Sequence, residues 1–111
     1  MARPNYFELP SADIVAAKTF YATAFGWQLT EFGPTYAGTT TGDVDVGLQG
    51  DAAEAPRAPL VVIEVEDLEA TLTIVQAAGG TISRPIFSFP GGRRFHFIDP
   101  NGNELAAYKP G

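Results

Sequence analysis

The sequence falls into two halves that repeat one order of elements, and this repeat restricts the folds open to the chain. Asp13-Ile-Val-Ala in the first half matches Asp67-Leu-Glu-Ala in the second half. Gly26 and Gly80 follow these two aspartates at the same spacing, and the strand patterns that precede them are also in step. A backbone plan that recurs in this way indicates two copies of one supersecondary unit.

The first half, residues 1–50, reads as a β-α-β-β-β module. A strand over residues 6–10 leads to Asp13, whose side chain can cap a helix that ends at Gly26. Apolar side chains recur at helical spacing along this helix, at Ile14, Ala17, Phe20, Tyr21, Ala24 and Phe25. Alternating patterns then predict three strands, over residues 27–32, 35–41 and 44–49.

The second half, residues 60–111, reads as the same module after a linker over residues 51–59. A strand over 60–65 leads to Asp67, and the helix that Asp67 opens ends at Gly79-Gly80. Apolar residues share one face of this helix, namely Leu68, Leu72, Val75 and Ala78. Pro85 then interrupts two further pieces of strand, 81–84 and 86–89.

The chain closes on two strands joined by a tight turn, Asp99-Pro-Asn-Gly102. Proline presets φ in such a turn, Asp and Asn bond their own backbone, and Gly accepts a positive φ. The stretch from the capping Asp to the glycine of the turn before the last strand is longer in the second half, where it runs from Asp67 to Gly102, than in the first half, where it runs from Asp13 to Gly42. We expect the additional residues to form a loop around 86–92, in which Phe87 and Phe89 either lie over a cleft and stack on a flat ligand or, the more common case, pack in the core.

Composition restricts the class of protein. A chain of 111 residues with 45% hydrophobic residues is long enough for one domain with a core of its own. The net charge of −6 and the scattered basic residues argue against nucleic acid as a partner. There is no cysteine and no apolar run of membrane-spanning length, so we expect a cytoplasmic protein with no membrane partner.

The closing sequence Phe97-Ile-Asp-Pro-Asn-Gly-Asn-Glu-Leu, together with Phe20-Tyr and Phe25-Gly-Trp in the first helix, resembles the vicinal oxygen chelate superfamily. This superfamily includes glyoxalase I, extradiol dioxygenases and bleomycin resistance proteins. The resemblance implies an α+β fold, in which two tandem β-α-β-β-β modules form curled mixed sheets around a cleft. It also implies a homodimer.

In metal-dependent members, the resemblance implies His and Glu ligands on the first and last strands of each module. The matching positions are occupied by Tyr6, Leu60 and Ala106, with Asp45, Gly47 and Gln49 on the matching face of the last strand of module one. Most of these are poor ligands, so we expect no metal cofactor. The alternative is an unusual divalent metal site drawn from Glu8, Asp45 or Gln49, Glu64, Glu104 and His96.

Strand alternation selects the residues expected to face the cleft. The predicted ligand-binding residues are Tyr6, Glu8, Gln49, Phe89, His96 and Tyr108. Glu8 is the best candidate for a catalytic base and could also bind a cation, although a solvated or salt-bridged glutamate is an equal alternative. His96 is either an acid-base group in the cleft or, the more common case, a partly exposed strand residue with local hydrogen bonds.

These observations predict a protein that binds a small aromatic or cationic molecule without a catalytic metal. The alternative is an enzyme of the glyoxalase (lyase or isomerase) or extradiol dioxygenase type, with an unusual metal site or Glu8 as a metal-free base. A third possibility is a structural or regulatory module that binds only its own kind.

Overall fold

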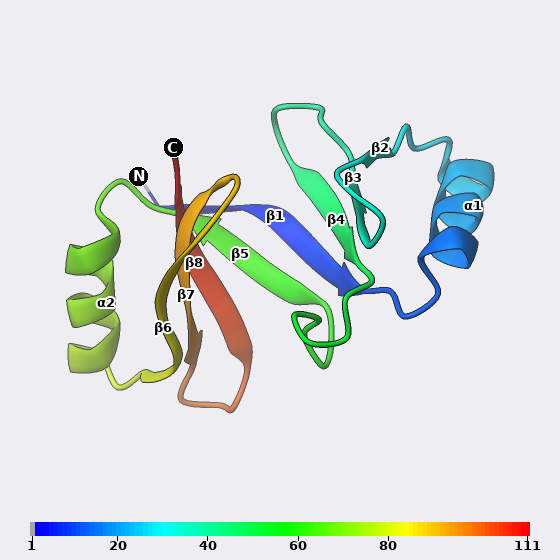
Figure 1. Cartoon of the computed structure of the whole chain (residues 1–111). Helices are drawn as coiled ribbons and strands as arrows, with labels where there is room; N and C mark the ends of the chain where they lie inside the picture. The colour runs from blue at the N-terminus through cyan, green and yellow to red at the C-terminus, as the bar shows by residue number, and fades with distance from the viewer. Residues whose placement is uncertain (1) are drawn as a thin grey trace. The chain divides into compact units, whose positions relative to one another are not determined.

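The computed structural model describes residues 2–111, which form two compact units (Figure 1). The first unit contains residues 6–60, and the second contains residues 61–111 together with residues 2–5. The elements follow in the order β1 (Arg3–Pro10), α1 (Ile14–Phe25), β2 (Thr30–Glu31), β3 (Tyr36–Gly38), β4 (Asp45–Gln49), β5 (Leu60–Glu64), α2 (Leu68–Ala77), β6 (Thr81–Phe89), β7 (Gly92–Ile98) and β8 (Glu104–Pro110). This order confirms the α+β class and the tandem β-α-β-β-β modules.

The first unit carries its strands in the order β2-β3-β4-β1. β4 pairs with β1 in parallel and with β3 antiparallel. Leu48 and Ala37 lie side by side on β4 and β3 and are fully buried, because strand alternation turns both toward the interior.

Helix α1 begins and ends where the sequence predicts. Asp13 Oδ1 accepts a hydrogen bond from the backbone nitrogen of Ala16, and Gly26 adopts a φ of 70° after the last turn. The apolar stripe is not buried, however: Phe20 and Phe25 are 58% and 64% exposed. Instead, the aromatic residues of this region pack on one another, and Tyr21 stacks on Trp27 at 4.8 Å between ring centroids.

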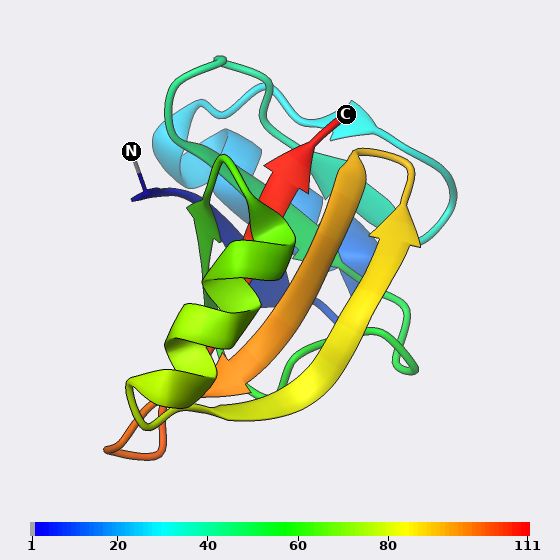
Figure 2. The same cartoon turned by 90° about the vertical axis from the view of Figure 1, so that its left-hand side faces the viewer.

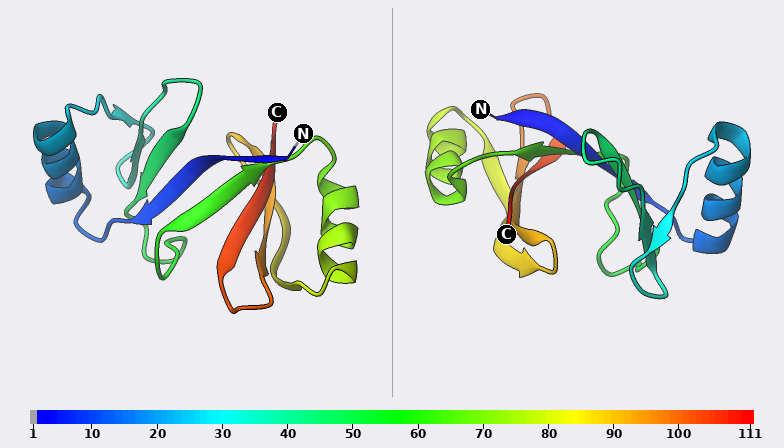
Figure 3. Two further views of the ribbon diagram at one scale, coloured as in Figure 1. Left: turned by 180° about the vertical axis from the view of Figure 1, so that it is seen from behind. Right: turned by 90° about the horizontal axis from the view of Figure 1, so that it is seen from above.

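The second unit carries its strands in the order β5-β8-β7-β6, so β8 lies between β5 and β7 (Figure 3). β8 pairs with β5 in parallel and with β7 antiparallel. Helix α2 lies against one face of this sheet (Figure 2). The core between them contains Val65, Leu68, Phe95 and Ala107, with Leu72, Val75, Ile82 and Phe97 packed around them.

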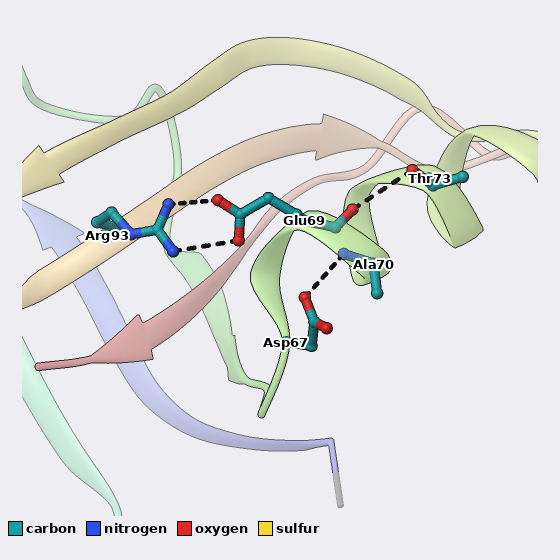
Figure 4. Close-up of polar contacts among 5 residues, drawn as sticks. All are labelled: Asp67, Glu69, Ala70, Thr73 and Arg93. Atoms are coloured by element: carbon teal, nitrogen blue, oxygen red, sulfur yellow. Dashed lines mark hydrogen bonds and ion pairs between the residues drawn. The ribbon is translucent and has the colours of Figure 1, made fainter.

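Two polar contacts fix the start of α2 (Figure 4). Asp67 Oδ1 accepts from the backbone nitrogen of Ala70, as expected of a capping residue. Arg93 on β7 donates from both terminal nitrogens to the Glu69 carboxylate, at 2.5 and 3.1 Å. This hydrogen bonding from Arg93 holds the pKa of Glu69 below its usual value.

The predicted turn between β7 and β8 is confirmed. Asp99 Oδ1 accepts from the backbone nitrogens of Asn101 and Asn103, and its Oδ2 accepts from Asn103 Nδ2. Gly102 has a φ of 85°, a conformation that a side chain would strain. The side-chain hydrogen bond from Asn103, followed by those from the backbone, lowers the pKa of Asp99.

Three sequence predictions of local structure are wrong. β2 and β3 are much shorter than the strands predicted over 27–32 and 35–41. Pro85 does not split the next strand, because β6 continues through it with register shifts on both sides of Arg84, where β6 is the edge of the sheet. The loop expected around 86–92 is also absent, since Phe87 and Phe89 lie on β6 and β7 begins at Gly92. None of the helices described over residues 2–111 is both long and apolar enough to cross a membrane.

Candidate functional site

Two tyrosines meet over a glycine in the first unit. Tyr6 on β1 and Tyr36 on β3 share a hydrogen bond between their hydroxyl groups. A Cβ at Gly47, on the intervening strand β4, would lie 1.9 Å from the Tyr36 hydroxyl and 2.1 Å from the Tyr6 hydroxyl. Only glycine leaves room for both hydroxyl groups at this position.

Glu8 lies on the same face of β1 as Tyr6 and pairs in register with Gly47. The side chain is part of the interior, because the residue is only 1% exposed. A carboxylate that is removed from water costs free energy unless other groups compensate it, so the fully solvated interpretation of Glu8 is wrong.

The other polar side chains of β4 have local structural roles. Asp45 accepts hydrogen bonds from the Thr39 hydroxyl and from the backbone nitrogens of Thr41 and Gly42. Burial opposes ionisation of Asp45, but these hydrogen bonds outweigh it and lower its pKa. Gln49 Oε1 accepts from the backbone nitrogen of Asp51, which fixes the chain just after β4.

In the second unit, the face of the sheet opposite the α2 core carries a cluster of polar side chains beside the buried apolar residues Val62 and Ala106. We call it the His96 face. It contains Glu64 on β5, Arg84 and Phe87 on β6, Arg94 and His96 on β7, and Glu104, Ala106 and Tyr108 on β8. Tyr108 donates to Glu64 Oε1 at 3.1 Å, and Asn5 Nδ2 donates to the same oxygen at 3.0 Å. Asn5 is thereby tied to this unit.

His96 is buried on this face, with 6% exposure, so the partly exposed interpretation is wrong. Its Nδ1 lies 3.5 Å from Glu104 Oε2, which also accepts a hydrogen bond from the Ser83 hydroxyl. Among residues 2–111, no group hydrogen-bonds its buried Nε2. Burial, and then the positive charge of Arg94, holds the pKa of His96 below its usual range, so the imidazole is neutral at pH 7.

Aromatic and cationic side chains surround this imidazole. The Phe87 ring lies 5.9 Å from the His96 ring, between centroids. Arg84 Cζ lies 3.6 Å from the centroid of Phe87, and Arg94 Cζ lies 5.2 and 5.3 Å from the centroids of Phe87 and Phe89. Both arginines therefore contact aromatic faces beside a buried neutral histidine.

The six predicted ligand-binding residues divide between the two units. Tyr6, Glu8 and Gln49 belong to the first unit, and Phe89, His96 and Tyr108 belong to the second. The six predicted residues omit Arg84, Arg94 and Phe87, although the sequence led us to expect Phe87 in a loop over the cleft. The alternation from Arg94 to His96 on β7 was a usable signal for Arg94, whereas the irregular register of β6 hid the phase of Arg84 and Phe87.

The residues at the metal-ligand positions of the superfamily do not fit a metal ion. Leu60 and Ala106 are buried aliphatic residues, and the Tyr6 hydroxyl shares a hydrogen bond with the Tyr36 hydroxyl. Asp45 is held by three local hydrogen bonds. Within the described chain, no three His, Asp or Glu side chains lie close enough together to hold a metal.

Comparisons with known proteins agree with this fold. The protein named "Putative glyoxylase CFP32" in Mycobacterium tuberculosis (strain CDC 1551 / Oshkosh), and its namesake in Mycobacterium bovis, are 30% identical over 117 residues. These cover 96% of this chain but only 45% of the relatives, so the chain spans about half their length.

Solved structures show the same fold at lower identity. The hypothetical protein BH1468 from Bacillus halodurans C-125 superposes with a TM-score of 0.81 at 14% identity, covering 99% of this chain and 95% of that one. A glyoxalase/bleomycin resistance protein/dioxygenase superfamily member from Vibrio splendidus 12B01 gives 0.76 at 20% identity, covering 98% and 99%.

A family model matches nearly the whole chain. The model is that of the Glyoxalase/Bleomycin resistance protein/Dioxygenase superfamily, and its match extends over residues 3–107. It includes both modules and the turn at Asp99 that joins the last two strands. The chain therefore belongs to the Glyoxalase/Bleomycin resistance protein/Dioxygenase superfamily.

Proposed function

We propose that this protein binds a small aromatic molecule on the His96 face, without a metal cofactor. The observation that carries the proposal is the buried imidazole whose Nε2 has no hydrogen-bond partner among residues 2–111. A buried polar atom left without a partner costs about 1–3 kcal/mol, and a bound molecule could remove that cost. Phe87 and Phe89 offer aromatic contacts beside it.

Charge distinguishes between the ligand classes expected from the sequence. Arg84 and Arg94 both place positive charge near His96, and both disfavour its protonated form. The same charge disfavours a cation at Nε2 and favours a neutral or negatively charged aromatic molecule. Of the two ligand classes expected from the sequence, aromatic and cationic, the proposal therefore keeps only the aromatic one. The negative net charge of the whole chain does not determine the charge of this face.

A binding experiment with three matched aromatic probes tests this function. Benzoate, benzyl alcohol and benzylammonium share a ring but differ in charge, and each is titrated by calorimetry. We expect benzyl alcohol, which has an O–H donor and no positive charge, to bind more tightly than benzylammonium, and His96→Phe to weaken the binding of benzyl alcohol; benzoate, which has no donor, measures the effect of negative charge alone. No heat with any probe, or equal binding by the wild type and His96→Phe, would contradict the proposed site.

Metal content is measured on the same preparations. We expect no stoichiometric divalent ion after purification without chelator or affinity tag, and no micromolar binding of Zn²⁺, Ni²⁺, Mn²⁺ or Fe²⁺. Near-stoichiometric metal that is lost in Glu8→Ala or His96→Ala would instead support the metal-dependent enzyme expected as the alternative.

A second candidate function is metal-free acid-base catalysis by Glu8. It is favoured by the burial of the Glu8 carboxylate on the face that carries Tyr6. A general base of this kind exchanges protons with a bound substrate. Incubating small α-hydroxy ketones with the protein in D₂O, followed by NMR, tests it. Deuterium incorporation that is lost in Glu8→Gln and kept in His96→Gln would support this function over binding alone.

We also propose that two copies of the chain form a homodimer, as the resemblance implies. Helix α1 and the loop after β2 expose large apolar side chains, and such a surface is typical of an interface. These side chains are Val15, Phe20, Phe25 and Phe32. Sedimentation of the wild type should give a dimer and that of Phe25→Glu a monomer. A monomeric wild type would contradict the proposal.

A further inference from the structure

We infer that the His96 face recognises a phenol: His96 Nε2 accepts the phenolic O–H, Phe87 contacts the ring, and Arg84 and Arg94 favour the phenolate. This inference rests on the proposed function, because it specifies the ligand of the same face. It follows from the tautomer of His96, from the charges that face the imidazole, and from the position of β6 in the sheet.

The tautomer follows from the neighbour of Nδ1. Glu104 Oε2 lies 3.5 Å from Nδ1, and an ionised carboxylate can only accept a hydrogen bond. Nδ1 of the neutral imidazole therefore carries the proton, and Nε2 carries the lone pair. Since Nε2 can only accept, its partner must present an O–H or N–H group. A ligand that offers only acceptors, such as a carboxylate or an ether, leaves Nε2 unsatisfied.

The charges around the imidazole favour a donor that can lose its proton. The groups that face His96 are Glu104 on β8, Arg94 on its own strand and Arg84 on β6. When the phenolic O–H bond breaks, the proton forms an N–H bond at Nε2 and the electron pair stays on the phenolate oxygen. Burial and the two arginines disfavour the imidazolium when no ligand is bound, but an adjacent phenolate and Glu104 both stabilise it, and the arginines stabilise the phenolate.

The aromatic ring of the ligand has contacts available on the same face. Phe87 already pairs with the His96 ring at 5.9 Å and carries Arg84 over its own face at 3.6 Å. A phenol ring beside His96 would contact the Phe87 ring, and edge-to-face or offset contacts between aromatic rings are favourable. A phenol offers both the ring and the acidic hydroxyl, whereas an aliphatic alcohol offers neither.

We expect β6 to be the strand of this sheet that moves to admit a ligand. β6 is an edge strand, and its pairing with β7 changes register on both sides of Arg84, which itself pairs with His96. Pro85 has no backbone N–H to contribute to that ladder. The pairing of β6 with β7 is therefore irregular beside His96, whereas the register between β8 and β7 is continuous. We expect ligand entry to displace β6 and to leave β7 and β8 in place.

Para-nitrophenol tests the inference, because its phenolate absorbs visible light and its neutral form does not. Para-nitroanisole is the matched probe, since it keeps the ring and lacks the O–H donor. At a pH below the phenol's own pKa, we expect binding to the full chain to produce the phenolate absorbance. We expect para-nitroanisole to bind about tenfold more weakly, the effect of one lost hydrogen bond.

Variants separate the roles of the residues. His96→Gln retains an acceptor without basicity, so it should bind para-nitrophenol without the phenolate absorbance, and it serves as the second variant if His96→Phe fails to fold. Arg84→Gln should reduce the phenolate fraction severalfold. Lys109→Gln, which removes one positive charge from an exposed position on β8, should leave the phenolate fraction unchanged.

The outcomes distinguish the inference from the function on which it rests. Equal affinity for the two probes, or a phenolate absorbance that persists in His96→Gln, would overturn phenol recognition while binding of an aromatic molecule stands. Failure of both nitro probes and of the benzoate series would overturn the proposed function as well. Higher amide exchange in β6 than in β8 on binding would support the entry path, and unchanged exchange in β6 would contradict it.

Discussion

Among the glycines of the first unit, Gly47 has the least room for a side chain. A methyl group there would overlap the hydroxyl groups of both Tyr6 and Tyr36 and would separate the hydrogen bond between them. We expect Gly47→Ala to lower the free energy of unfolding by about 1–3 kcal/mol, as other overpacking substitutions do. Urea denaturation measures the change.

The control for Gly47→Ala is the same substitution in a Tyr36→Ala background. Removal of the Tyr36 ring takes away the nearest clash, so the added methyl group should cost less there than in the wild type. An equal cost in both backgrounds would show that the two tyrosines do not explain the glycine.

His96 gives the second unit a pH-dependent stability. Its pKa is lowered in the folded chain, so below about pH 6.5 the unfolded chain takes up a proton that the folded chain does not. The contribution of His96 is therefore fully present above this pH and is lost progressively as the pH falls. We expect His96→Gln to show a shallower fall in unfolding free energy between about pH 6.5 and 5. Identical slopes in urea denaturation would contradict this prediction.

At the scale of the elements, the two helices carry equivalent caps but differ in what they bury. Asp13 and Asp67 each accept from the backbone nitrogen three residues later. Leu68 in α2 is fully buried, whereas α1 has no buried residue. Loss of the α2 cap should therefore affect the whole second unit, and loss of the α1 cap should affect α1 alone.

Asp67→Ala and Asp13→Ala test this difference as a matched pair. We expect Asp67→Ala to lower the unfolding free energy by about 1 kcal/mol, the usual cost of a lost cap. Asp13→Ala should raise amide exchange within α1 and leave the denaturation midpoint nearly unchanged. Asp67→Asn keeps a capping oxygen and should restore most of the stability. A larger fall for Asp13→Ala would contradict the argument.

The elements that sequence could predict are those whose signals are local. The capping aspartates, Gly26 and the Asp99 turn each fix a boundary through their own backbone bonds, and the structure confirms them. β6 was misjudged because Pro85 usually ends a strand, whereas an edge strand tolerates it. The burial of His96 had no local signal, since neighbouring strands and not its own sequence remove it from water.

At the scale of the whole molecule, the order of elements followed from the repeat, but the division into units did not. Residues 2–5 group with the second unit although they precede the first in the chain. Hydrophobic periodicity reports which face of a strand is buried and carries no information on which strand it pairs with.

Removal of residues 1–5 should therefore weaken the second unit. The truncated chain loses the Asn5 donor to Glu64, and we expect faster amide exchange in β5 than in β4. Hydrogen exchange with mass spectrometry measures both strands in one experiment. Asn5→Ala, which removes only the side-chain donor, should produce a smaller change in β5. Faster exchange confined to β4 would contradict the grouping of residues 2–5.

The central position of β8 has a consequence for synthesis in the cell. β5 and β7 leave the ribosome earlier, and although β7 can already pair with β6, neither β5 nor β7 has β8 beside it until this last strand is inserted between them. Until β8 is synthesised, the apolar side chains of α2 and of the β6-β7 hairpin lack the contacts that β8 provides and stay exposed to water. A pause or premature stop codon after the Asp99 turn would release a nascent chain with that layer uncovered, and we expect such a product to be a chaperone client.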